Sequence, residues 1–426
     1  MKKVLIISYY WPPSGGAGVQ RWLKFVKYLP QFGIQPHVYT PSNPEAPAQD
    51  ESLQKDIPSE AVIVQQPIFE PYSFYKKFTG KKGNINAGFL SEDKDSRQKF
   101  TEKMSIWVRG NLFIPDARVM WVKPSIKFLT KYIKENEIEV VISSGPPHSM
   151  HLIAMELKRK LNIKWIADFR DPWTNIDFYK DLMLTNWADK KHHRLEKEVL
   201  QKADEIITIG KTIASELEII RGKKVHVITN GFDSEDFSTA SQNANEDFSI
   251  IHIGSINSDR NHEIFWRGIS ELMSDNAGFN KKLKIIFIGK LDYSVYEVIE
   301  KYNLKEKVEI ISYLPHDEAV NYLSTASLLY LPLNNTPNAK GILSGKFFEY
   351  LAVGKPILGI GHPNGDAAEI MIETQAGVIV DFDDLIQLKQ FILEQFNLTK
   401  NNTIADLGKR YKYSRKSLTE DLVKLF

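Results

Sequence analysis

The chain has 426 residues, which is too long for one hydrophobic core, so two or three domains are expected. Its 55 lysine and arginine residues nearly balance its 53 acidic residues, and this balance gives no overall field that would favour nucleic acid as a partner. Because the sequence has no cysteine, it excludes disulfides, thiolate nucleophiles and zinc–thiolate sites, and we expect a cytoplasmic protein.

The first apolar run predicts a buried strand and not a signal peptide, because Trp11-Pro-Pro follows it without a small-residue cleavage site. No segment approaches 18 uninterrupted apolar residues, so a membrane-spanning helix is not expected. Short β-rich runs then alternate with amphipathic helical segments, which is the pattern of parallel sheets covered by helices. The strands expected in the first half are residues 4–8, 37–40, 140–143, 164–168, 205–209 and 224–229.

A second series of strands follows a polar linker at residues 231–248. The pattern therefore predicts an α/β protein with two doubly wound Rossmann-like domains facing a cleft, at residues 1–230 and 249–403. Residues 404–426 are basic and helical in pattern, and we expect them to pack back on the first domain. The strands expected in the second half are residues 250–253, 283–288, 308–312, 327–331, 356–360 and 377–380.

A glycine-rich turn follows the first strand and opens a helix at residues 21–29. The spacing of Gly15, Gly16 and Gly18 differs from the dinucleotide-binding fingerprint, which disfavours an oxidoreductase. Such glycines let a ligand approach the backbone closely, or they simply make a strand-to-helix turn.

Residues 69–135 interrupt the regular alternation with many aromatic and basic side chains. Solvated helices with some core aromatics explain this composition, and so does a surface for anionic lipid headgroups. The second interpretation predicts peripheral contact with a membrane and suits a lipid-borne substrate. The residues concerned are Tyr72, Phe74, Tyr75, Lys76, Lys77, Phe78, Lys81, Lys82, Trp107, Phe113 and Trp121.

Ligands of such sheets bind beyond the carboxyl ends of the strands, so functional residues are expected in the loops that follow strands. His148 lies in such a loop and is better placed than His192, His193 and His362, which lie in polar helix or turn contexts.

Asp168 and Asp171 end the next strand, with Arg170 between them. This acidic pair can orient an acceptor hydroxyl, or it can form a structural ion network, and the sequence favours neither interpretation.

In the second half, Arg260 begins a helix after a strand and is suited to neutralise a leaving diphosphate, or it is a capping or surface arginine. The run from Asp381 to Asp384 contains the D-x-D letters of metal-dependent sugar transferases. It follows a strand and begins a helix, where aspartate is a good N-cap, so we predict no metal site there.

The most informative segment is residues 340–358, where a loop of small residues opens a helix. The backbone N–H groups of Leu343, Ser344 and Gly345 lie where a helix start binds phosphate oxygens. Glu349, more than one turn further, suits sugar hydroxyls, so one helix can hold both the phosphates and the ribose of a nucleotide. The alternative is a plain buried helix.

Taken together, these features resemble the retaining GT-B glycosyltransferases with an E-x7-E signature (group 1, family 4-like), over nearly the whole chain. The resemblance implies that the first domain binds an acceptor and the second binds a nucleotide sugar. The matching landmarks are the Gly15-Gly16 loop, the turn Thr229-Asn-Gly-Phe-Asp233, Gly254 and the block Phe348-Glu-Tyr-Leu-Ala-Val-Gly-Lys-Pro-Ile357.

By this resemblance Glu349 contacts the nucleotide ribose, residues 343–345 donate to the diphosphate, and His148 lies near the donor sugar. The candidate catalytic residues are His148, Asp168 and Asp171. The candidate donor-binding residues are Gly15, Gly16, Asn230, Ser255, Arg260, Leu343, Ser344, Gly345, Lys346 and Glu349.

Two positions depart from the family pattern. Gly341 stands where the first glutamate is expected, and Ser255 stands where one of two basic residues flanks the diphosphate. Lys340 or Lys346 can substitute for the missing charge.

The resemblance implies transfer of a sugar from a nucleotide diphosphate sugar to an acceptor hydroxyl, with retention of configuration and without metal or cofactor. Bacterial polysaccharide or glycolipid assembly, with a carbohydrate or lipid-linked acceptor, is expected at the cytoplasmic face of the membrane. Two alternatives remain, a sugar-nucleotide epimerase of the same architecture that would use Asp168 and Asp171, and a nucleotide-sugar-binding protein without turnover, favoured by Gly341 and Ser255.

Overall fold

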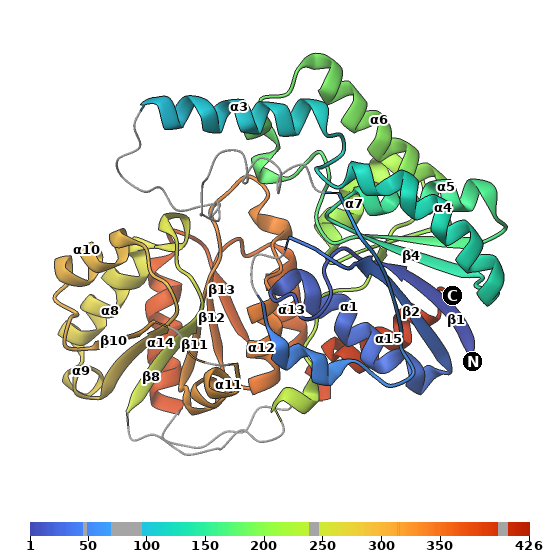
Figure 1. Cartoon of the computed structure of the whole chain (residues 1–426). Coiled ribbons are helices and arrows are strands. Elements are labelled where there is room, and N and C mark those ends of the chain that lie inside the picture. Colours follow the sequence, from blue (N-terminus) through green and yellow to red (C-terminus); the bar gives the residue numbers. More distant parts are fainter. Residues whose placement is uncertain (46–48, 70–95, 238–246, 313, 315, 399–407) are drawn as a thin grey trace. The chain divides into compact units, whose positions relative to one another are not determined.

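The computed structural model describes residues 1–45, 49–69, 96–237, 247–312, 314, 316–398 and 408–426 (Figure 1). Internal contacts divide the chain into two compact units. The first unit comprises Met1–Thr229 and Leu418–Phe426, and the second comprises Asn230–Ser417. The chain therefore passes from one unit to the other twice.

The first unit contains a parallel sheet with the strand order β3-β2-β1-β4-β5-β6-β7. Parallel neighbours of this kind need helical crossovers, and the described helices supply them on both faces. The strands are β1 (Lys2–Ile7), β2 (Ile34–Pro41), β3 (Val62–Gln66), β4 (Val140–Gly145), β5 (Lys164–Phe169), β6 (Glu205–Thr208) and β7 (His226–Val227). The helices are α1 (Ala17–Tyr28), α3 (Ser96–Leu112), α4 (Val119–Asn136), α5 (Ser149–Lys160), α6 (Asn186–Lys202) and α7 (Lys211–Arg221), with the 3-10 turns η1 (Leu29–Phe32), η2 (Glu51–Asp56) and η3 (Asp177–Leu182).

Alternation along the strands gives this sheet two buried faces. Val4 and Ile6 of β1 point into a core that includes Trp22 of α1, whereas Leu5 and Ile7 point into a core with α4 and α5. Helix α15 (Arg415–Val423) contributes to the α1 side, where Leu418 and Leu422 belong to the same core.

The second unit contains a parallel sheet with the order β10-β9-β8-β11-β12-β13. One face is covered by α8, α9, α10 and α14, and the other by α11, α12 and α13. The strands are β8 (Phe248–Ile253), β9 (Leu283–Ile288), β10 (Val308–Ile311), β11 (Leu328–Pro332), β12 (Ile357–Ile360) and β13 (Gly377–Val380). The helices are α8 (Glu263–Asp275), α9 (Ala277–Lys282), α10 (Tyr293–Lys301), α11 (His316–Thr325), α12 (Gly345–Val353), α13 (Asp366–Thr374) and α14 (Leu385–Leu398), with the 3-10 turns η4 (Ser234–Phe237), η5 (Ser258–Arg260), η6 (Ala339–Gly341) and η8 (Gly408–Tyr413).

The two Rossmann-like parallel sheets confirm the predicted fold class. Strand β3 was not predicted, because its apolar run is only three residues long and it forms the edge of the sheet. Within the predicted linker, residues 234–237 form η4 and β8 begins at Phe248. The predicted aromatic and basic segment from Tyr72 to Lys82 lies outside the described residues.

In both sheets the strand order reverses beside the first strand, between β1 and β4 and between β8 and β11. Open parallel sheets bind ligands at such switch points, beyond the carboxyl ends of the strands. Of the helices that the structure describes, none has the length and apolar character needed to cross a membrane.

Candidate functional site

The glycine-rich turn after β1 lies at the switch point of the first sheet. Gly16 has a φ of 99°, a conformation that suits glycine, and it immediately precedes α1. A Cβ at Gly16 would meet nothing within 4 Å, whereas one at Gly18 would approach the Tyr10 ring at 3.3 Å. Gly15 is buried and Gly16 is exposed, so the open space at this turn is at Gly16.

Asp168 is fully buried and its carboxylate is saturated with donors. Arg21 donates to both carboxylate oxygens, from Nε at 3.1 Å and from Nη2 at 3.0 Å. Trp22 Nε1 donates at 2.8 Å and Ser144 Oγ at 2.9 Å. This arrangement ties α1 and β4 to β5 and corresponds to the structural ion network, one of the two interpretations of the acidic pair.

Arg170 and Asp171 are placed differently from Asp168. Arg170 donates to the Gly18 carbonyl at 2.8 Å and to the carbonyls of Gly145 and Pro146, so it fixes the loops after β1 and β4. Asp171 is half-buried, and burial raises the pKa of its carboxyl while Arg170 opposes that shift. Asp171 is thus the member of the acidic pair that keeps some access to solvent.

His148 lies at the N-cap of α5 and is 8% exposed. Its ring stacks on Trp173 with a centroid separation of 4.6 Å and an interplanar angle of 3°. Burial lowers the pKa of His148 well below its usual value, and His151 adds to the shift, so the ring is neutral at pH 7. Among the described residues, His148 Nδ1 has no hydrogen-bond partner.

Gly145 explains how two histidines fit at the end of β4. A Cβ at this position would stand 2.6 Å from His151 Nε2 and 2.9 Å from His148 Nδ1, so no larger residue is accommodated without a shift. Ser143 Oγ and His151 Nδ1 are hydrogen-bonded at 2.8 Å, and Ser143 Oγ also accepts a hydrogen bond from Trp165 Nε1. These contacts hold the His151 ring beside the His148 ring, with a centroid separation of 5.7 Å.

Helix α6 supplies two buried side chains, His192 and Glu196. The polar helix context expected for His192 was wrong, because this side chain is only 2% exposed, and Glu196 was not singled out by the sequence patterns. Trp173 Nε1 donates to His192 Nδ1 at 3.1 Å, and His192 Nε2 lies 3.4 Å from the Gly110 carbonyl. One turn further, Glu196 accepts from the Thr174 hydroxyl at 2.6 Å and from the Thr174 N–H at 3.3 Å. His192 and Glu196 therefore hold the loop whose tryptophan stacks on His148.

In the second unit, Lys346 reaches the switch point between β8 and β11. A Cβ at Gly254 would stand 1.6 Å from Lys346 Nζ, so the ammonium lies against the Gly254 Cα at the end of β8. Gly254 has a φ of 126° and Gly289, after β9, has a φ of 135°, conformations that suit glycine. Neither strand end therefore carries a side chain of its own. Burial and the nearby Arg260 guanidinium lower the pKa of Lys346 to about 8.

Arg260 ends η5 and lies close enough to Lys346 for the two cations to repel. Its Nε donates to Asn334 Oδ1, which follows β11, and burial lowers its pKa. Ser255 is exposed beside Gly254. Of the two expected basic positions, Arg260 is present, and Lys346 supplies the second charge from a different element.

Ser344 is the N-cap of α12, and its side chain accepts from the Phe347 N–H. Among the described residues, the N–H groups of Leu343, Ser344 and Gly345 have no acceptor. Gly345 is exposed, and a Cβ there would meet nothing within 4 Å. The helix start is thus open, and the partly buried Glu349 lies one turn further along the same helix.

His252 is a further residue that sequence reasoning missed. It is fully buried near the end of β8, and its Nδ1 donates to the Tyr330 carbonyl at 2.9 Å. Burial and Lys346 lower the pKa of His252 to about 3, so the ring is neutral. Among the described residues, its Nε2 has no partner, and in this tautomer Nε2 is an acceptor.

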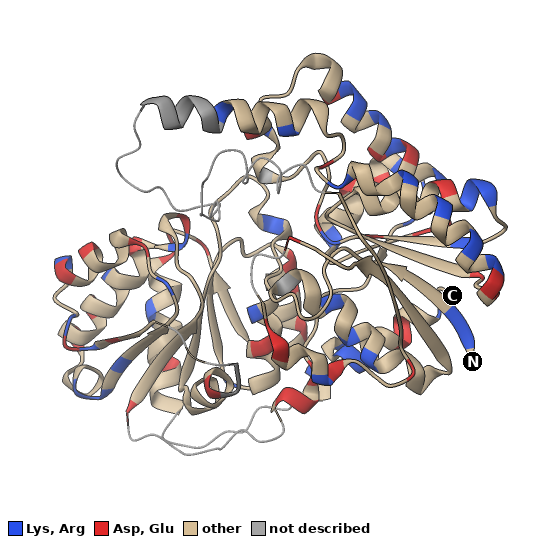
Figure 2. Ribbon diagram, viewed as in Figure 1, with Lys and Arg blue, Asp and Glu red and all other residues tan. Residues whose placement is uncertain are grey.

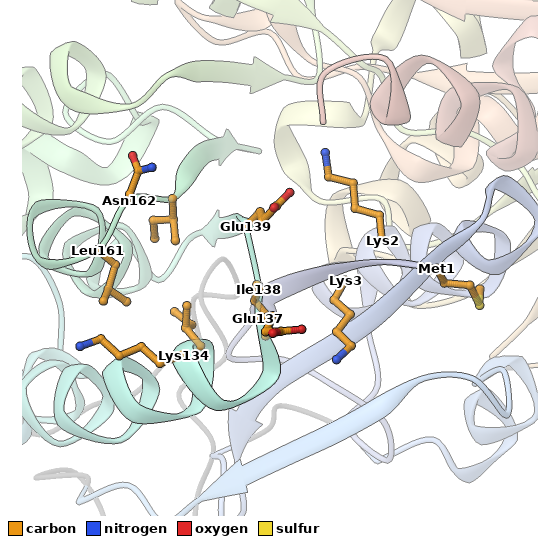
Figure 3. Close-up of a pocket in the computed structure, with 11 residues that line it drawn as sticks. Met1, Lys2, Lys3, Lys134, Glu137, Ile138, Glu139, Leu161 and Asn162 are labelled. Atoms are coloured by element: carbon orange, nitrogen blue, oxygen red, sulfur yellow. The ribbon is translucent and has the colours of Figure 1, made fainter.

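The remaining candidate positions have structural roles or stay unassigned. Asp384 Oδ1 accepts from the Gln387 N–H, which is the expected N-cap of α14. Asn230 is half-buried at the start of the second unit. A cavity of about 710 Å³ opens at the amino ends of β1, β4 and β5, where Lys2, Lys3 and Glu139 line it (Figure 3). His148 follows the carboxyl end of β4, so this cavity lies at the opposite end of the strands.

Residues 233–409 match the family model for glycosyl transferases group 1, and residues 90–236 match the model for Glycosyltransferase Family 4. No curated protein matches the sequence. Solved structures with similar folds cover the whole chain, and at their low identities they show the fold alone. One is a glycosyltransferase from Rickettsia africae, with 13% identity and a TM-score of 0.63 over 100% of this chain and 97% of that chain. Another is sucrose-phosphate synthase from Thermosynechococcus elongatus, with 12% identity and a TM-score of 0.59 over 100% of this chain and 98% of that chain. A third is a variant of S. aureus TarM in complex with fondaparinux, alpha-GlcNAc-glycerol and UDP, with 11% identity and a TM-score of 0.58 over 100% of this chain and 99% of that chain.

The two family matches meet at the junction between the compact units and together extend from residue 90 to residue 409. With the two parallel sheets, they support a GT-B glycosyltransferase of group 1.

Proposed function

We propose that this protein transfers a sugar from a nucleotide diphosphate sugar to an acceptor hydroxyl, with retention of anomeric configuration and without a metal ion. The second unit binds the donor, with the diphosphate at the start of α12. The acceptor is a carbohydrate or a lipid-linked carbohydrate, and the reaction belongs to polysaccharide or glycolipid assembly. It takes place at the cytoplasmic face of the membrane.

The observation that carries this proposal is the accumulation of positive charge around Gly254. Lys346 has no hydrogen-bond acceptor among the described residues, although it is half-buried next to a second cation, Arg260, and the Glu349 carboxylate offsets only part of the effect of burial and of Arg260 on its pKa. The N-terminus of α12 adds the positive end of its helix dipole to the same region. An ammonium that loses water without gaining an acceptor is costly, so its retention favours an anionic ligand at this place.

A nucleotide diphosphate matches these groups better than a simple anion. The open N–H groups at residues 343–345 suit phosphate oxygens, and Arg260 suits two oxygens at once. Glu349 suits ribose hydroxyls at the other end of the same helix turn. In the reaction, Lys346 and Arg260 would stabilise the charge that grows on the leaving diphosphate, which is the role of a metal ion in other transferases.

In the first unit we assign the position near the donor sugar to His148. Its ring is neutral, and its unpaired Nδ1 can accept a hydrogen bond from a sugar hydroxyl. We assign acceptor orientation to Asp171, and to Asp168 a positioning role through Arg21, because the Asp168 carboxylate already accepts from three side chains. The turn at Gly15 and Gly16 lets the donor or acceptor approach the backbone.

The hydrogen bonds that already occupy the Asp168 carboxylate weaken the epimerase alternative, because an epimerase of this kind would use the acidic pair as acid and base. A binding protein without turnover remains the competing proposal, since Gly341 and Ser255 lack the expected side chains. Lys346 supplies one of the missing positive charges near Gly254, which favours a transferase over a binding protein.

The test is thermal unfolding of the purified protein with UDP, GDP and ADP sugars, followed by product analysis with the stabilising donor. Saturation at about 100 times Kd adds about 2.7 kcal/mol of stability, which gives a clear shift in Tm. We expect a shift for one base, lost in Glu349→Ala and in Lys346→Met. Turnover that needs a second substrate supports a transferase, turnover of the donor alone supports an epimerase, and binding without turnover supports the third class. A failure of every nucleotide to shift Tm would contradict the proposal.

A further inference from the structure

The backbone ladder between β8 and β11 ends before either strand does. Of the β11 residues, Leu328 and Leu329 pair with β8, whereas β8 stays paired with β9 as far as Ile253. One further step of the β8–β11 ladder would join the Ile253 N–H to the Tyr330 carbonyl. The sheet therefore opens at its switch point and separates this donor from this acceptor.

Two side chains fill the opening and satisfy both backbone groups. The Ile253 N–H donates to Tyr350 Oη at 2.9 Å, and His252 Nδ1 donates to the Tyr330 carbonyl at 2.9 Å. His252 Nδ1 also lies 3.4 Å from Tyr350 Oη, so the two side chains contact each other. Both are at most 2% exposed, and a buried backbone group without a partner is costly. We call this pair, His252 and Tyr350, the side-chain wedge.

The wedge connects the end of β8 to the helix whose start is open. Tyr350 belongs to α12 and follows Lys346 by four residues, so both side chains lie on the same face of the helix. Tyr350 contacts Ile253, and Lys346 Nζ lies against the next residue, Gly254. Lys346 is the one lysine or arginine in the sequence of α12 (Figure 2). One face of α12 thus contacts two consecutive residues at the end of the strand.

The hydrogen bond of Tyr350 specifies this arrangement more sharply than apolar packing does. The neighbouring side chains of α12, Phe347, Phe348 and Leu351, are buried in the core of the second unit. Apolar burial of this kind is non-directional. The hydrogen bond, in contrast, depends on both distance and angle. It therefore selects the position of α12 at which Lys346 reaches the strand end.

We propose that Tyr350 is a positioning residue for the donor diphosphate, and that His252 supports it by occupying the Tyr330 carbonyl. The wedge holds the open start of α12 and the Lys346 ammonium at the end of β8, where open parallel sheets bind ligands. In this role Tyr350 acts through Lys346 and touches no ligand itself. The identity of the ligand rests on the proposed function, whereas the effect of the wedge on Lys346 does not.

The first test is nucleotide binding by Tyr350→Phe, which removes one oxygen atom and leaves the Ile253 N–H without its acceptor. We expect the affinity for a nucleotide diphosphate, measured by titration calorimetry with UDP, GDP and ADP, to fall about three- to tenfold. The matched control is Tyr39→Phe, because the Tyr39 hydroxyl is also buried and donates to Ser125 Oγ at 2.9 Å in the first unit. This control likewise removes one buried hydrogen bond and should leave the affinity unchanged.

A second measurement needs no ligand and follows the charge of Lys346 in the free protein. Burial and the Arg260 guanidinium lower the pKa of Lys346 to about 8, Glu349 opposes this shift, and His252, which also faces the ammonium, is neutral. Labelling with trace acetic anhydride at a series of pH values, read by mass spectrometry, measures the pKa of each lysine. In Tyr350→Phe the midpoint for Lys346 should move from about 8 toward the usual 10.5, because a displaced ammonium regains water.

Variants of His252 provide the test if Tyr350→Phe does not fold. His252→Gln keeps an N–H for the Tyr330 carbonyl and should retain the wild-type midpoint of Lys346, whereas His252→Leu should raise it. A midpoint that is unchanged in both Tyr350→Phe and His252→Leu, or an equal loss of affinity in Tyr39→Phe, would overturn the proposal. Raised midpoints in a protein that binds no nucleotide would contradict the proposed function and still support the effect of the wedge on Lys346.

Discussion

The ammonium of Lys346 occupies the space that a side chain on Gly254 would need, with the ideal Cβ position only 1.6 Å from Nζ. Two residues that are far apart in the sequence thus meet at one strand end. The glycine makes room and the lysine brings charge, so a change at either residue should affect the same ligand.

Lys346→Met should weaken binding of a nucleotide diphosphate by about tenfold or more, since a hydrogen bond to a charged group contributes about 1.5–3 kcal/mol. Methionine keeps most of the apolar stem, so the fold should be unaffected. Titration calorimetry with UDP, GDP and ADP measures the loss. Lys340→Met is the matched control, because Lys340 is exposed on the neighbouring turn, and its affinity should equal that of the wild type. Equal losses in both variants would contradict the assignment of Lys346.

Gly254→Ala should damage the same site from the other side. At a φ of 126° an L-residue is strained by about 1–3 kcal/mol, and its Cβ would push the lysine away. We expect lower stability in urea unfolding together with weaker donor binding. A variant that loses stability but keeps full donor affinity would show that Lys346 does not act from its position beside Gly254.

Donor affinity should fall as pH rises through about 8. Lys346 has a folded-state pKa of about 8, below the usual 10.5, so the charged form is disfavoured before ligand binds. An anionic ligand favours the charged form, and binding at pH 8 should therefore take up about half a proton. Calorimetry at pH 8 in buffers of different ionisation enthalpy measures this uptake. In Lys346→Met the uptake should disappear, and an unchanged uptake in that variant would assign the proton to another group.

Asp168→Asn should lower the free energy of unfolding of the first unit by about 3–5 kcal/mol, because it leaves the buried Arg21 guanidinium without its counter-charge. Urea unfolding followed by tryptophan fluorescence checks this, since Trp22 donates to the same carboxylate. Glu156→Gln, at the surface pair with Arg159, is the control and should cost less than about 1 kcal/mol. A stable Asp168→Asn protein that has lost only turnover would instead support a catalytic role for this carboxylate.

His192→Ala should reduce kcat with little change in donor KM, because Trp173 loses its hydrogen-bond acceptor and no longer fixes the stacked His148 ring. His193→Ala, one position further on α6 and exposed, should leave kcat unchanged. His192→Gln can partly restore the acceptor and should recover part of the loss. If His192→Gln is no better than His192→Ala while both fold normally, the positioning role is wrong.

The parallel sheets were predictable because each apolar run is short and recurs at the spacing of strand and helix units. The helix that carries Glu349 was likewise predictable, since glycine and serine before it mark a helix start. Strand β3 was missed because Val62, Ile63 and Val64 are too few to stand out, and the edge of a sheet buries fewer apolar side chains.

The contacts that define the site were harder to predict, because they join residues far apart in the chain. Nothing local distinguishes the buried His192 from the exposed His193, and only the position of Trp173 in space decides between them. In the same way, Arg21 looks like an ordinary helix residue in the sequence, and its partner Asp168 lies 147 positions away. Lys346 could be nominated as a substitute charge, but its place against Gly254 depends on how α12 packs on β8.

Leu418 and Leu422 complete the core beside α1, although the whole second unit separates them from the rest of the first unit in the chain. During synthesis, residues 1–229 leave the ribosome long before α15 exists. The first unit therefore cannot bury this part of its apolar surface until α15 has left the ribosome, which happens only when synthesis of the whole second unit is complete.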